Sequence, residues 1–66
     1  MSATLLRLKA VMACTGLSRS SIYASIQQRT FPRPVKIGPR AVGWVDSEIH
    51  EWIGKRIEAS RAKDRR

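Results

Sequence analysis

The chain has 66 residues, and thirteen Lys and Arg against five Asp and Glu give it a formal net charge of +8. This length is enough for one domain, which buries only about 60% of the surface of the unfolded chain, and a lone cysteine excludes an internal disulfide. The sequence shows neither a signal peptide nor an apolar run near the roughly 20 residues needed to cross a bilayer, so a soluble cytoplasmic protein is expected.

The first predicted helix covers about residues 8–14. Apolar residues at Leu8, Val11 and Met12 follow the i, i+3, i+4 spacing of one helical face. Gly16 is expected to end this helix, because glycine adopts a positive φ at low cost. Cys14 is expected to pack as a small apolar residue in a reducing compartment, with a redox-sensing role as the alternative.

The second predicted helix runs from Arg19 to about Gln28. Ser18 directly before it is a good N-cap residue. Ile22 and Ile26, with part of the Tyr23 ring, form the stripe that faces the core. Two short helices joined by a tight turn that contains glycine, the second one capped and basic, are typical of a helix-turn-helix.

The outward positions of this second helix carry short or hydrogen-bonding side chains and no acid. Such a face enters a major groove without steric hindrance and offers donors to phosphates and base edges. A solvated helix whose serines serve only as caps is the alternative. The candidate DNA-contacting residues of this helix are Ser18, Arg19, Ser20, Ser21, Tyr23, Ala24, Gln27 and Gln28.

A basic β-hairpin is predicted after two prolines that cannot continue the helix. Its turn is Gly38–Ala41, with Arg40 at the tip and Lys36 on the exposed face. Such a hairpin beside a helix-turn-helix is a wing, and Lys36 and Arg40 are candidates for contact with the DNA backbone or minor groove. The alternative is a turn arginine that only aids solubility. Because an isolated hairpin is marginal in water, it is expected to pack on the helices through Val35, Ile37, Trp44 or Val45.

The last predicted helix begins at Asp46, which suits an N-cap. Its outer face mixes charges, with Glu51 and Lys55 at a favourable i, i+4 spacing, so this helix is predicted to be scaffold. Both tryptophans are expected in the core. The domain is predicted to span residues 1–60, followed by a basic, disordered tail at 61–66. The expected buried stripe of this helix is Ile49, Trp52, Ile53 and Ile57.

The charge distribution along the chain is one-sided. Residues 1–45 hold seven basic residues and no acid, while all five acids lie in the last 21 residues. A surface that serves only solubility normally mixes charges of both signs. A segment of one sign indicates a polyanionic partner, with nucleic acid first and an anionic membrane face second.

Five linked motifs stand out along the chain: Arg7–Lys9, Thr15–Tyr23, Phe31–Gly38, Arg40–Trp44 and Glu48–Trp52. Together they resemble the AlpA family of prophage regulators. The resemblance spans about residues 6–57 and implies a mainly α winged helix-turn-helix with three helices and a two-stranded wing, related to phage excisionases and more distantly to MerR-type domains. It implies a recognition helix at residues 18–28 and a wing at residues 36–44.

Two positions depart from the family pattern. Many members have glycine before the Phe-Pro pair, where this chain has Arg29 and Thr30, so a less relaxed end of the recognition helix is expected. Ala24 stands where relatives often have a larger polar or basic residue, which could change the base preference or favour a thymine methyl contact. Within the motif itself, Ser18, Arg19, Ser20 and Tyr23 match and are the best contact candidates.

The leading hypothesis is a sequence-selective protein that binds double-stranded DNA in the nucleoid. The resemblance implies a transcriptional regulator or an excisionase, and an integrase or further copies of the chain are the partners considered with it. The alternative is an inhibitor that binds a transcription factor or integrase directly, although the sequence offers no long exposed apolar patch for this. Neither an enzyme nor a cofactor or metal is expected, because Cys14 and His50 stand alone and no nucleophile–base motif is present.

Overall fold

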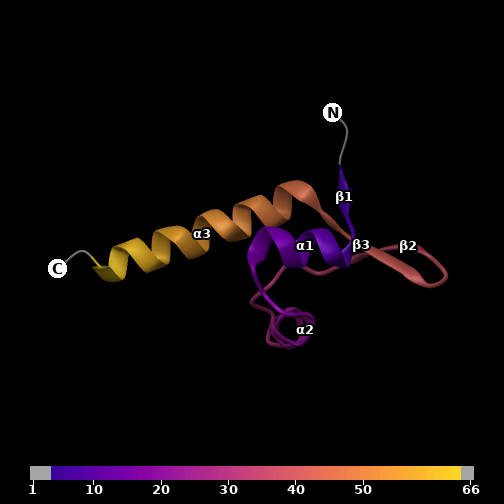
Figure 1. Ribbon diagram of the computed structural model, residues 1–66, viewed down its shortest axis with the longest axis horizontal. Helices are drawn as coiled ribbons and strands as arrows, with labels where there is room; N and C mark the ends of the chain where they lie inside the picture. The colour runs from indigo at the N-terminus through magenta and orange to yellow at the C-terminus, as the bar shows by residue number, and fades with distance from the viewer. Residues whose placement is uncertain (1–3, 65–66) are drawn as a thin grey trace.

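The computed structural model describes residues 4–64 and contains three helices and a small antiparallel sheet (Figure 1). This arrangement confirms the predicted mainly helical, winged-helix-like fold. Helices α1 and α2 cross beside the sheet, and the long helix α3 leaves the sheet and extends past both. In chain order the elements are β1 (Leu5–Leu6), α1 (Leu8–Thr15), α2 (Arg19–Gln27), β2 (Val35–Gly38), β3 (Ala41–Val45) and α3 (Asp46–Asp64).

The sheet has three strands in the order β1-β3-β2, one more than the predicted hairpin. Strand β1 pairs with β3 through Leu6 opposite Trp44, and the Asp46 N–H donates a hydrogen bond of 2.8 Å to the Thr4 carbonyl just beyond this pairing. On the other edge, β2 pairs with β3 with Val35 opposite Gly43. Strand β3 is therefore the central strand of the sheet, and β1 covers the edge that an isolated hairpin would leave free.

The turn between α1 and α2 forms as predicted. Gly16 has a φ of 74° and its N–H donates to the Met12 carbonyl at 2.8 Å, which closes α1 one residue later than expected. Ser18 caps α2, because its Oγ accepts a hydrogen bond from the Ser21 N–H at 3.2 Å. These two short-range features set the angle at which the chain enters α2.

We expect Ser18→Ala to lower the free energy of unfolding by about 1 kcal/mol, because the Ser21 N–H then loses its acceptor. Ser20→Ala is the matched control, since Ser20 lies in the same exposed turn. Urea unfolding followed by circular dichroism measures both variants. Equal stability of the two variants would contradict the cap.

Both predicted core tryptophans contact the core, although to different depths. Trp44 is fully buried, whereas Trp52 is partly buried and packs its ring edge against Phe31, with centroids 4.8 Å apart. Cys14 is exposed, contrary to the expectation that it packs as a small apolar residue. The buried residues are Val11, Ile22, Phe31, Trp44 and Ile49.

The hairpin packs on the helices as expected, but through β3 and not through β2. Val35 and Ile37 are 43% and 46% exposed, and β3 carries the contact with the helices through Trp44 and Val42. Ile37 instead lies over Gly43 on the outer face of the sheet, where a Cβ on Gly43 would be 2.6 Å from Ile37 Cδ1. Leu5, 41% exposed, borders the same glycine. This outer face is an exposed apolar patch that the sequence did not reveal.

Helix α3 is longer and less buried than expected. It continues to Asp64, four residues past the predicted end at 60, and residues 65–66 of the predicted tail lie outside the described residues. Ile57 was assigned to the buried stripe but is 45% exposed, because the core ends one turn earlier. Glu51 and Lys55 form the predicted ion pair at 3.3 Å. None of the helices in residues 4–64 combines the length and the apolar composition of a membrane span.

Candidate nucleic-acid interface

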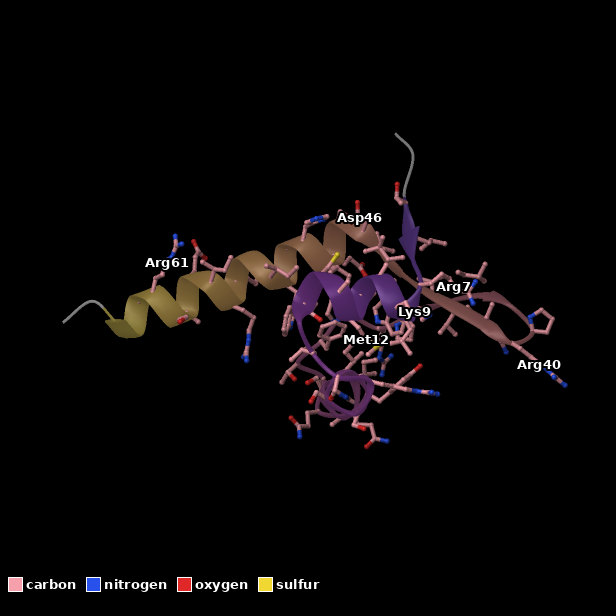
Figure 2. All side chains as sticks on the ribbon, viewed as in Figure 1. Arg7, Lys9, Met12, Arg40, Asp46 and Arg61 are labelled. Carbon is pink, nitrogen blue, oxygen red and sulfur yellow. The ribbon has the colours of Figure 1, made fainter. Side chains whose placement is uncertain are left out.

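Helix α2 presents every predicted contact residue to solvent. Its inner side is held by Ile22, which is fully buried, and by Ile26, which packs against the core. The outer side therefore stands clear of the rest of the fold, at the edge of the molecule opposite β1 (Figures 1 and 2). The exposed candidates are Ser18, Arg19, Ser20, Ser21, Tyr23, Ala24, Gln27 and Gln28.

Tyr23 links the outer side of α2 to the core. Its ring lies edge-on to Trp44, with centroids 6.5 Å apart, while the residue as a whole remains 39% exposed. The Arg19 guanidinium lies 5.9 Å from the centre of the same ring, a cation–π distance. Tyr23 thus holds Arg19 against the first turn of α2 and reduces the freedom of its long side chain.

At the start of α2, some polar groups are already hydrogen-bonded within the helix and others are available to a ligand. The Ser18 and Ser21 hydroxyls bond to each other at 3.0 Å, and Ser18 Oγ also caps the helix. The N–H groups of Arg19 and Ser20 precede the first helical hydrogen bond, so the helix itself provides them with no acceptor. An anion at this end would meet those two N–H groups and the positive end of the helix dipole.

The wing places its two predicted contact residues at different depths along the hairpin. Arg40 is exposed in the turn between β2 and β3, at the far tip of the sheet (Figure 2). Lys36 is exposed further back and pairs with Val42, whose side chain packs on the core. Because paired residues point to the same face of a sheet, Lys36 lies on the helix-bearing face rather than on the apolar outer face.

The acids whose side chains are described belong to a single element. They are confined to α3, where Lys55 pairs with Glu51 and His50 Nδ1 lies 2.9 Å from the Asp46 carboxylate. Helix α2 and the wing contain no acid at all. The charged side chains of α2 and the wing are therefore all positive.

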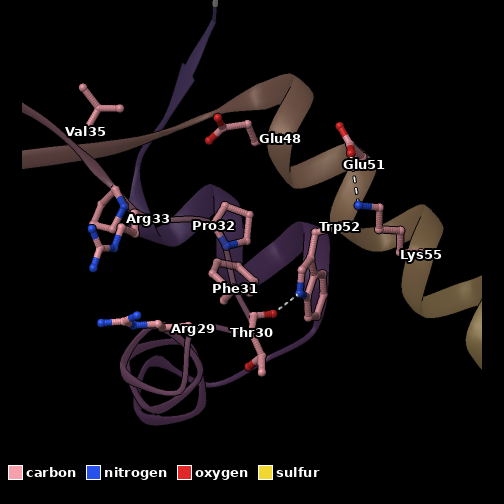
Figure 3. A pocket seen from close by; sticks show the side chains of 11 residues that line it. Arg29, Thr30, Phe31, Pro32, Arg33, Val35, Glu48, Glu51, Trp52 and Lys55 are labelled. Carbon is pink, nitrogen blue, oxygen red and sulfur yellow. Dashed lines mark hydrogen bonds and ion pairs between the residues drawn. The ribbon is translucent and has the colours of Figure 1, made fainter.

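The site candidates did not include two exposed arginines, Arg29 and Arg33, which follow α2. Together with Phe31 they line one hollow, and a larger one of about 720 Å³ continues past Trp52 onto α3 (Figure 3). The available signal was Arg29-Thr30, where the family resemblance implies a glycine before the Phe-Pro pair. Within the described residues, no cluster of three or more His, Cys, Asp or Glu lies close enough to hold a metal ion.

A capped helix that stands clear beside a basic β-hairpin defines a winged helix-turn-helix protein. The chain belongs to the prophage CP4-57 regulatory protein (AlpA) family, whose model matches residues 4–57. It is 38% identical over 60 residues to the DNA-binding transcriptional activator AlpA of Escherichia coli (strain K12), covering 82% of this chain and 86% of that protein. It is also 44% identical over 52 residues to the uncharacterized protein ORF88 of Enterobacteria phage P4, covering 79% of this chain but 59% of that protein.

Proposed function

We propose that this chain binds double-stranded DNA sequence-selectively in the cytoplasm and regulates transcription for a prophage or genomic island. The observation that carries the proposal is the exposed, acid-free surface of α2 and the wing, with the described acids confined to α3. The family relationship supports it, since the Escherichia coli relative is a DNA-binding transcriptional activator. The same binding would also serve an excisionase, which organises DNA for an integrase at an attachment site.

In the proposed complex, α2 enters the major groove. An α-helix fits this groove, which is about 12 Å wide, and the short side chains on the outer face of α2 allow close approach. Gln27 and Gln28 carry amides of the kind that pair with adenine edges, and Arg19 can donate two hydrogen bonds to guanine or to a phosphate. Ala24 offers a methyl group to thymine.

The wing supplies the second contact of the proposed complex. Arg40 at the tip of the hairpin reaches the backbone or an adjacent minor groove, and Lys36 on the helix-bearing face neutralises a phosphate between the two. A single module of this kind covers roughly 600–1,000 Å² of protein surface. Tight occupancy therefore calls for repeated sites bound by several copies, or for a second protein such as an integrase.

Selection from a random duplex pool tests the proposal. Purified protein is expected to enrich a defined sequence, and its affinity for that sequence should fall steeply as salt rises, because bound lysines and arginines release counterions. A gel-shift titration of the enriched duplex against a scrambled one measures the selectivity. Absence of duplex binding even in dilute buffer would refute the proposal.

A second candidate is an inhibitor that binds a transcription factor or integrase directly. The apolar outer face of the sheet, with Leu5, Val35 and Ile37 all exposed, favours it because exposed apolar patches often mark protein contacts. Co-purification of a partner with the tagged protein after nuclease treatment would support this candidate. Loss of the partner on nuclease treatment would leave DNA as the ligand.

A further inference from the structure

Arg29 has an unusual backbone conformation at the end of the proposed recognition helix. Its φ is 62°, and it is the one non-glycine residue with a positive φ in the part of the chain that the structure describes. The Arg29 N–H donates to the Ile26 carbonyl at 3.0 Å and the Thr30 N–H to the Ser25 carbonyl at 2.9 Å. These two bonds form a Schellman motif, whose left-handed position is usually glycine. An arginine there carries a conformational cost that glycine would avoid.

The segment that follows Arg29 is held in place by both tryptophans. The Trp52 indole N–H donates to the Thr30 carbonyl at 2.7 Å, and the Trp44 indole N–H donates to the Pro32 carbonyl at 3.1 Å. Phe31, between these two carbonyls, is 5% exposed and packs on Trp52. We call Thr30–Pro32 the indole-held segment. The hydrogen bonds to this segment restrict the backbone of the residues that flank it on either side.

The two flanking residues are Arg29 and Arg33, and both are exposed. Arg33 lies between two prolines, which restrict its backbone to an extended conformation. Figure 3 shows the two guanidinium groups one above the other on the same side of the indole-held segment, away from Glu48 and Glu51. The two arginines line one hollow. Neither takes part in the ion pairs found among the described residues.

We infer that Arg29 and Arg33 form a phosphate-binding pair that holds the DNA backbone beyond the C-terminal end of α2. A guanidinium is the side chain best suited to phosphate, and two of them at fixed positions lose less conformational freedom on binding than free arginines do. A recognition helix in the major groove ends beside a strand of the backbone, which brings phosphates to this pair. The inference rests on the proposed binding of DNA by α2.

The variant Arg29→Gly distinguishes a phosphate contact from a purely structural role, because the two roles predict different changes in the affinity for DNA. Glycine relieves the positive φ, so the midpoint of thermal unfolding should rise by several degrees for a chain of this size. The affinity for DNA should nevertheless fall, because a charge is removed from the interface. A residue that served only to shape the turn would give a stabler protein with affinity equal to or above that of the wild type.

The decisive measurement is fluorescence anisotropy with a labelled mixed-sequence duplex over a salt series. The double variant Arg29→Gln with Arg33→Gln keeps polar side chains but removes both positive charges, and we expect it to bind roughly tenfold more weakly. Its plot of log affinity against log salt should have a slope smaller by about 2. Arg61→Gln removes one charge from the far part of α3 and should change the affinity much less (Figure 2).

The outcomes separate this inference from the proposed function. Wild-type binding with unchanged affinity and salt slope in the double variant would overturn the phosphate-binding pair and leave the proposed function intact. Failure of the wild type to bind any duplex would overturn both. Weaker binding of the double variant to every duplex, with the base preference of the wild type retained, supports the pair as a backbone contact.

Discussion

Trp44→Ala should abolish cooperative folding at ambient temperature. Trp44 is fully buried, and its ring meets Tyr23 of α2 while its indole N–H donates to the Pro32 carbonyl. Truncating a buried tryptophan costs roughly 3–5 kcal/mol. A domain of this length has little more than that in total, since small proteins are stable by about 5 kcal/mol. Circular dichroism with urea titration measures the loss directly.

Trp44→Phe is the matched variant for this prediction. It keeps an aromatic ring in the core but leaves the Pro32 carbonyl without its donor, so we expect an intermediate loss of about 1–3 kcal/mol. Arg61→Ala, which alters an exposed position on α3, should have no measurable effect on stability. A Trp44→Ala protein that unfolds at nearly the wild-type urea concentration would contradict the central role of this side chain.

Arg19→Ala should remove selective DNA binding without unfolding the protein. Arg19 is exposed, and its described contact is with the Tyr23 ring at 5.9 Å, so its loss leaves the core intact. A good bidentate contact from arginine contributes about 1–3 kcal/mol of discrimination between bases. Affinity for the selected duplex should therefore drop by roughly 10- to 100-fold. Gel-shift titration with the selected and the scrambled duplex measures both the affinity and the selectivity.

Arg19→Lys separates charge from geometry in this test. Lysine keeps the positive charge but cannot make the same planar pair of hydrogen bonds, so general affinity should be retained better than selectivity. A circular dichroism spectrum equal to that of the wild type is required of both variants. If Arg19→Ala binds the selected duplex as the wild type does, the assignment of α2 as the recognition helix is wrong.

The elements that follow from local chemistry were predicted well. Gly16 ends α1 with a positive φ, and Ser18 caps α2, because each feature depends on residues within one turn of the chain. The predicted ends of the two helices differ from the observed ones by one residue each. The family resemblance singled out Arg29 and Thr30 as a departure, but it did not predict which conformation Arg29 adopts.

The errors in the predicted burial arise where the exposure of a residue depends on which distant element packs over it. Strand β1 has two residues, too few for any periodicity to be visible, and it forms because β3 offers a free edge. Alternation in β2 predicted which residues share a face, but not that Val35 and Ile37 lie on the face without a helix. Ile57 fits the helical stripe of α3 yet lies past the end of a small core.

The contact roles of the candidate site remain predictions, for a related reason. The sequence identified the exposed side of α2 because Ile22 and Ile26 mark the side that faces the core, and the other side must then face solvent. Which base or phosphate each side chain meets depends on the DNA and on how the domain docks. Arg33 carried no distinguishing sequence signal, since its position beside Arg29 depends on the indole-held segment.

The indole-held segment also joins two parts of the molecule that would each read DNA. It lies between the end of α2 and the start of β2, and hydrogen bonds from Trp44 on β3 and Trp52 on α3 hold it. Helix and wing are consequently set at one separation and one angle. A DNA site must therefore present its major-groove bases and the neighbouring minor groove at a matching spacing and rotation. Insertion of a single base pair between these two parts of the site should lower the affinity as much as a base change does.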